Sequence, residues 1–194
     1  AANHVEGIMT QGAYQSPGGE RDWMRSWVIA KLLWDPGRDL SALMQDFIYG
    51  HYGEAAPAIA EYNELLRKQG ETFKEALAQP AGGIRYHMDH PFLTKEFLDA
   101  ASELFARAEA QAESEEVLHR VELASLPIFY VKLARGPKFV GEEYGQVLER
   151  FETIARREKA VYLSEVWGAA DLDQKLNHWR GRWQKYSERN SAQP

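Results

Sequence analysis

The sequence has 194 residues, a formal net charge of −6, 44% hydrophobic residues and no cysteine. This length and composition predict one main globular domain and argue against a disordered chain. The acidic balance disfavours general binding of nucleic acid, and the lack of cysteine excludes disulfide bonds and thiolate metal sites. No stretch reaches the roughly 18 consecutive apolar residues that a membrane span needs, so we expect no such span.

The first predicted element is a β-strand in the sequence GIMTQGAY, residues 7–14. A glycine-rich loop follows, and then a helix is predicted from Gly19 to Trp34, because Ser16 can cap it and Pro17 suits a first turn. A strand that leads into a helix is the βα unit of a parallel sheet, yet no second convincing strand follows. A strand without a partner is not stable in water. We therefore expect the chain to begin inside the last βα unit of a larger barrel.

All later elements are predicted as helices. Asp39, Thr94 and Ser114 each precede an apolar periodic segment and are the expected N-caps. The longest stretch without helical periodicity is residues 79–93. The predicted helices cover residues 40–49, a segment that begins beyond Gly53 and carries Pro57 in its first turn, 94–112, a segment that begins after Ser114, 142–167 and 172–186. This pattern predicts a mainly α fold.

Three tryptophans of the first helix raise a choice between a core and a binding surface. Trp23, Trp27 and Trp34 recur at helical spacing on one face, together with Ala30. Such a stripe is typical of a buried core, and this is the favoured interpretation. The alternative is a sugar-stacking platform, which exposure of Trp23 or Trp27 to solvent would support.

Two further clusters are interpreted as structural. The sequence His87-Met88-Asp89-His90 offers metal-ligating side chains, but it lacks the spacing that places two histidines on one helical face, so a surface turn is predicted. Residues 175–189 carry five basic residues against the single acid Glu188, interleaved with aromatic residues. Because these aromatic residues continue a helical stripe from Leu172, we expect them to be buried and predict no nucleic-acid partner.

The sequence resembles the C-terminal part of a bacterial family known as a domain of unknown function. The similarity covers about residues 5–133 and includes the run Lys31-Leu32-Leu33-Trp34-Asp35-Pro36 and the pattern Phe47-x-x-Gly50-x-Tyr52-Gly53. Members of this family resemble α-glucuronidases in overall layout. Some are endo-β-N-acetylglucosaminidases that release N-glycans from glycoproteins.

The resemblance implies a (β/α)8 catalytic barrel followed by a helical C-terminal region. Residues 1–36 would hold the last βα unit and residues 37–194 the helical domain. The catalytic carboxylates would lie on earlier barrel strands, so we assign no catalytic residue, metal or cofactor to this chain and expect no hydrolysis by it alone. The resemblance also implies a bacterial protein that is secreted, periplasmic or at the cell surface.

Two residues are the expected substrate contacts. Active sites of such barrels form at the C-terminal ends of the strands, where Gln11 and Tyr14 would lie. The Gln11 amide can donate and accept hydrogen bonds, and the Tyr14 ring can stack on a pyranose. The alternative roles are structural, with Gln11 holding the loop and Tyr14 packing under the first helix.

Two other functions remain open at this stage. The chain could be a helical carbohydrate-binding module or a helical protein-interaction module without an enzymatic parent. If barrel strands normally cover the first helix, an apolar patch should be exposed near Val5, Ile8 and that helix. Self-association through this patch is a further expectation.

Overall fold

The computed structural model describes residues 7–10, 16–77, 87–160, 162–163 and 172–191, and this described part of the chain is mainly helical. The mainly α fold class is therefore confirmed. None of the described helices is long and apolar enough to cross a membrane. The elements are α1 (Asp22–Trp34), α2 (Leu40–Tyr52), the 3-10 helix η1 (Gly53–Ala55), α3 (Ala56–Thr72), α4 (Lys74–Leu77), α5 (Lys95–Ala110), α6 (Glu115–Arg135), α7 (Pro137–Val140), α8 (Tyr144–Arg157) and α9 (Leu172–Ser191).

The predicted opening strand is not found in the part of it that the structure describes. Residues 7–10 are exposed and form no regular secondary structure, while residues 11–15 lie outside the described residues. A strand requires a partner for its backbone hydrogen bonds, and the described residues offer residues 7–10 none in a sheet. The last βα unit of a barrel is thus not confirmed, and the division into residues 1–36 and 37–194 stays a prediction.

The predicted N-caps are confirmed at three helices. Asp39 Oδ1 accepts a hydrogen bond from the Ala42 backbone N–H at 2.7 Å at the start of α2. Thr94 and Ser114 act in the same way for α5 and α6, with distances of 3.1 and 3.2 Å from their hydroxyl oxygens to the backbone nitrogens three residues ahead. These short side chains satisfy donors that the first helical turn leaves free.

Several predicted helix boundaries were wrong. Ser16 does not cap α1, which begins three residues later than expected, after Arg21 in a left-handed conformation with φ of 54°. α2 continues past Gly50 to Tyr52, and α9 continues past Tyr186 to Ser191. α8 ends at Arg157, well before the predicted end, because the chain turns at Lys159, which has φ of 57°. Left-handed residues stop a helix regardless of its periodic pattern.

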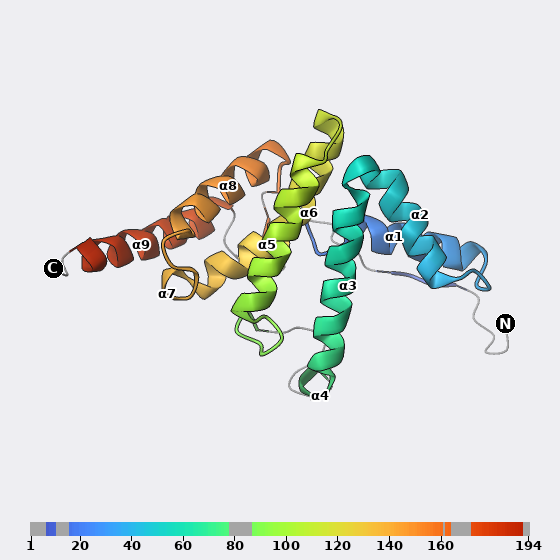
Figure 1. Cartoon of the computed structure of the whole chain (residues 1–194), viewed down its shortest axis with the longest axis horizontal. Coiled ribbons are helices and arrows are strands. Elements are labelled where there is room, and N and C mark those ends of the chain that lie inside the picture. The colour runs from blue at the N-terminus through green and yellow to red at the C-terminus, as the bar shows by residue number, and fades with distance from the viewer. Residues whose placement is uncertain (1–6, 11–15, 78–86, 161, 164–171, 192–194) are drawn as a thin grey trace.

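Two hydrophobic cores share α6 as their common wall. In Figure 1, α1 and α2 lie on one side of the α5–α6 pair, and α7, α8 and α9 lie on the other side. The first core joins α1, α2, α3 and α5 to residues of α6 such as Val121, whereas the second joins α7, α8 and α9 to others such as Leu133. α6 can serve both cores because it is apolar on most of its circumference.

Candidate functional site

A cavity of about 340 Å³ opens beside the loop that leads into α1. This loop is fixed against α6, because Gly18 has φ of 97° and an added Cβ there would lie 2.9 Å from Leu126 Cδ1. Ser16 Oγ also accepts a hydrogen bond from the Tyr162 backbone N–H at 3.1 Å. A side chain would be strained at Gly18, so glycine allows the loop to approach α6 closely and to hold the next residues at the cavity.

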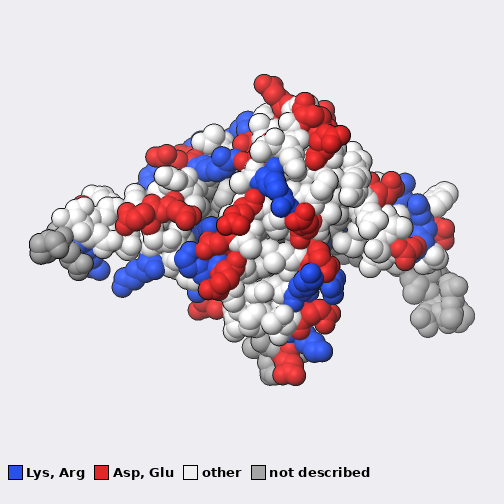
Figure 2. All heavy atoms as spheres, viewed as in Figure 1, with Lys and Arg blue, Asp and Glu red and all other residues white. Residues whose placement is uncertain are grey.

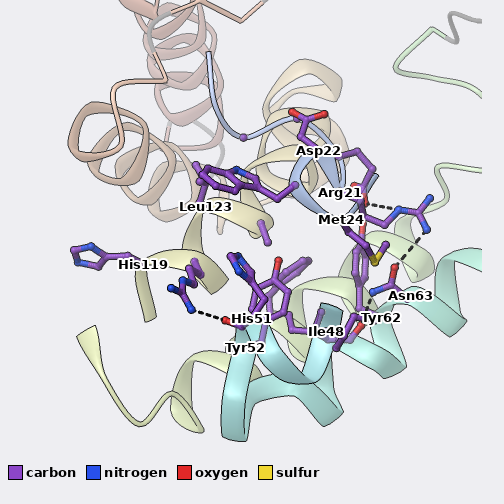
Figure 3. Close-up of a pocket in the computed structure, with 18 of the residues that line it drawn as sticks. Arg21, Asp22, Met24, Ile48, His51, Tyr52, Tyr62, Asn63, His119 and Leu123 are labelled. Carbon is purple, nitrogen blue, oxygen red and sulfur yellow. Dashed lines mark hydrogen bonds and ion pairs between the residues drawn. The ribbon is translucent and has the colours of Figure 1, made fainter. Parts of the chain in front are cut away.

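The polar centre of the cavity is a hydrogen-bonded pair, Glu20 and Tyr62. The Tyr62 hydroxyl donates to Glu20 Oε2 at 2.8 Å, and Arg21 Nε lies 3.4 Å from the other carboxylate oxygen. Arg21 also donates through Nη1 to Asn63 Oδ1 at 3.3 Å, as the dashed line in Figure 3 shows. Asn63 in turn donates to the Ile59 carbonyl at 2.9 Å. The loop and α3 are therefore joined through consecutive polar side chains.

Burial sets the protonation behaviour of this pair. The Glu20 side chain keeps about 35% of its surface exposed. Desolvation raises the pKa of Glu20, although the hydrogen bond from Tyr62 and the charges of Arg21 and Arg25 oppose this. Burial and the negative charge of Glu20 raise the pKa of Tyr62 well above its usual value, so its hydroxyl stays a donor.

An aromatic cluster around His51 forms a second wall of the cavity. The His51 ring stacks on Phe47 at 4.8 Å and on Trp23 at 6.1 Å, and meets the edge of Tyr52 at 4.8 Å between ring centroids. Burial, with the nearby charge of Arg120, lowers the pKa of His51 to about 4. The imidazole is therefore neutral at pH 7. Trp23 keeps 60% of its surface exposed at this wall.

The two walls differ in chemistry, and together they suit a small polar ligand. Figure 3 shows Tyr62 and Asn63 on one side of the cavity and His119 at the opposite edge. Rings can pack on the aromatic wall, while the Glu20 carboxylate accepts hydrogen bonds. Among the residues that the structure describes, no three His, Cys, Asp or Glu side chains gather as a metal site would require.

Of the substrate contacts predicted from the sequence, Gln11 and Tyr14 lie outside the described residues. Their contact with substrate stays a prediction. The predicted turn at residues 87–90 is confirmed, since the His90 backbone N–H donates to the His87 carbonyl at 3.0 Å. The aromatic stripe of α9 is confirmed as core at Trp179, which is 2% exposed, and Trp183 is half-buried.

The predicted burial of the α1 tryptophans was wrong for two of the three. Trp27 packs against the first core, but Trp23 and Trp34 are 60% and 92% exposed. The buried residues of α1 are Met24 and Val28, which occupy another arc of the helix. Because apolar residues surround α1, spacing alone did not identify the arc that faces the core. Ile8 and several apolar residues of α1 are exposed, as the expected patch requires, whereas Val5 lies outside the described residues.

Sequence reasoning missed the pair of Glu20 and Tyr62. Glu20 was placed in the first helical turn, where the helix dipole explains an acid without any site. The signal that could have indicated a site was the sequence Ser16-Pro17-Gly18-Gly19, whose glycines allow close backbone approach. The partner Tyr62 lies 42 residues away along the chain, so no local pattern contains both.

Comparisons with known proteins give one match. The model of a family described as a domain of unknown function (DUF4838) matches residues 1–64. A search of curated proteins and a search of solved structures each found no match. The matched region ends just after Asn63. It therefore includes the loop with Glu20, α1, α2 with His51 and the part of α3 that contains Tyr62, and all three of these residues line the cavity.

Proposed function

We propose that this chain is the C-terminal helical part of a glycoside hydrolase that acts on glycans, and that it supports a (β/α)8 catalytic barrel. The observation that carries this proposal is the outer face of α1. Ile29, Leu33 and Trp34 are 37%, 49% and 92% exposed, whereas Met24 and Val28 of the same helix are buried. Large apolar side chains that are exposed along a helix indicate a surface that another part of a protein normally covers. In a βα unit, the helix packs on the strands of the barrel, so barrel strands are the partner expected for this face of α1.

The substrate part of the proposal rests on the resemblance to N-glycan endo-β-N-acetylglucosaminidases. Glycoside hydrolysis usually requires placed carboxylates, and we assign these to barrel strands rather than to residues 1–194. The chain alone would therefore be inactive. The same resemblance supports a bacterial protein that is secreted, periplasmic or held at the cell surface.

The test compares hydrolysis of a labelled N-glycan by two polypeptides. One is this chain, and the other is the same chain extended by the coding sequence upstream of it in its own gene. We expect only the extended polypeptide to release glycan. Turnover by the chain alone would contradict the supporting role, and inactivity of both would contradict the proposed activity on N-glycans.

A second candidate function, a helical carbohydrate-binding module, is favoured by the exposure of Trp23. Its ring lines the cavity and remains 60% exposed, as a stacking surface for sugar requires. In this case the chain alone would be retained on an immobilised N-glycan without cleaving it. Retention that disappears with Trp23→Ala would support the binding module, whereas passage of the unaltered chain through the column would contradict it.

A further inference from the structure

We propose that the cavity between Glu20 and Trp23 binds one neutral sugar ring, which stacks on the indole and donates a hydroxyl hydrogen bond to the carboxylate. This inference rests on the proposed function, because it assigns a substrate class to a specific site. It adds a contact surface that lies outside the predicted residues Gln11 and Tyr14.

The size of the cavity fits a single ring. Its volume of about 340 Å³ lies near the lower end of the range of roughly 300 to 1,000 Å³ that small-molecule sites occupy. The lining combines apolar side chains such as Ile48 and Leu123 with the polar pair of Glu20 and Tyr62. A pyranose has the same combination, with C–H groups on its faces and hydroxyls around its edge.

Trp23 is held in place for stacking. Its ring lies at 27° to the imidazole of His51, which is itself stacked on Phe47 at 24°. His51 is neutral at pH 7 because its pKa is lowered to about 4. The indole thus rests on an uncharged aromatic support and keeps more than half of its surface free. Trp34, on the same helix, is even more exposed but does not line the cavity.

Glu20 supplies the acceptor for a hydroxyl. Tyr62 holds one carboxylate oxygen at 2.8 Å, which fixes the orientation of the group. The other oxygen lies 3.4 Å from Arg21 Nε, longer than a strong charge-assisted hydrogen bond of about 2.7 to 2.9 Å. This oxygen can accept a shorter hydrogen bond from a ligand O–H.

The charge pattern favours a neutral ligand over an acidic one. A uronic acid would bring a second carboxylate next to Glu20 and would need a cation to neutralise it. The arginines at the cavity already have partners: Arg21 pairs with Glu20 and Asn63, and Arg120 with Glu116 and the His51 carbonyl. Arg21 Nε is buried without a hydrogen-bond partner among the described residues, but the guanidinium charge already faces Glu20, so an anionic ligand would compete with that carboxylate.

The experiment is a ligand-observed NMR titration of the chain with methyl glycosides of N-acetylglucosamine, glucose and glucuronic acid at pH 7. We expect a neutral glycoside to bind at least about tenfold more tightly than the glucuronide, because a charged ligand loses hydration without gaining a partner. Trp23→Ala should weaken binding of the neutral glycoside by about tenfold, as expected for loss of an aromatic contact surface. The matched control Trp34→Ala should leave binding within about twofold.

Three outcomes would overturn the proposal. These are no binding by either neutral glycoside, binding of the glucuronide at least as tight as theirs, or equal weakening by Trp23→Ala and Trp34→Ala. Both tryptophans are exposed, so the variants should fold, which circular dichroism verifies. Hydrolysis by the N-terminally extended polypeptide is measured separately. Glycan hydrolysis by the extended polypeptide, together with no glycoside binding at the cavity, would overturn this inference alone. Glycoside binding at the cavity without hydrolysis would overturn only the proposed hydrolase.

Discussion

α1 and α8 have nearly the same length, 13 and 14 residues, but their outer faces are opposite in character. α8 buries Tyr144, Phe151 and Ile154 on one face and presents charged side chains on the other. α1 also buries one arc, yet its outer arc carries exposed Leu33 and Trp34. The outer face of α8 is therefore a polar surface suited to water, whereas the outer face of α1 presents apolar side chains suited to a partner.

The charged face of α8 is tied to its neighbours. Arg157 donates to Glu122 of α6 at 2.6 Å, and Arg150 pairs with Glu109 of α5. Arg180 of α9 pairs with Glu152. On the face of the molecule in Figure 2, acidic and basic side chains are interspersed in this way. These ion pairs link α8 to α5, α6 and α9.

The largest expected effect comes from the cores that both halves possess. Phe105→Ala in the first core and Phe151→Ala in the second should each lower the free energy of unfolding by about 3 to 5 kcal/mol, because these rings are fully buried. Urea unfolding measures the loss. We expect a single transition for the parent chain, since α6 belongs to both cores. A loss below about 1 kcal/mol for either variant would contradict the assignment of that core.

Acid should lower the free energy of unfolding through His51, which lines the cavity in the N-terminal half. Its folded-state pKa of about 4 lies below the ordinary value of 6.5, so the unfolded chain takes up this proton first. The stability contributed by neutral His51 is complete above pH 6.5 and is lost as pH falls from there through about 4.

Unfolding free energies measured from pH 7 to pH 4 test this expectation. The parent chain should lose more stability over this range than His51→Gln, which cannot take up the proton. The raised pKa of Glu20 acts in the opposite direction, because its ionisation costs stability as pH rises. Glu20→Gln should therefore steepen the loss on acidification, and equal slopes for the parent and His51→Gln would contradict the role of the imidazole.

Local and distant features differed in how far the sequence could predict them. The caps Asp39 and Ser114 were predictable because each acts on a backbone N–H three residues away. The contact of Tyr62 with Glu20 depends on how α3 packs beside the loop, which no local rule specifies. Exposure of Trp34 was not predictable either, because the apolar residues of α1 are spread around most of the helix and give little periodic signal for its buried arc.

A smaller effect is expected at the charged face of α8. Glu122→Gln removes a carboxylate that is 13% exposed and that contacts both Arg150 and Arg157. We expect a loss of about 1 kcal/mol in the free energy of unfolding, since partly buried ion pairs are worth more than surface pairs. Adding about 1 M sodium chloride, which screens exposed charges, should reduce the difference in unfolding free energy between the two chains. A difference that is zero at low salt would show that the network does not stabilise α8.

The smallest effect on stability is expected at the outer face of α1. The same substitutions should change apolar-dye binding and self-association. The double variant Ile29→Glu and Leu33→Lys replaces two exposed apolar residues with an ion pair one helical turn apart. Its free energy of unfolding should stay within about 0.5 kcal/mol of the parent, because neither side chain belongs to the core. Binding of an apolar dye and any concentration-dependent self-association should both fall, because the exposed patch is interrupted. A large loss of stability would mean that this face packs within the chain after all, whereas unchanged dye binding would mean that α1 is not the apolar surface the N-terminal half presents.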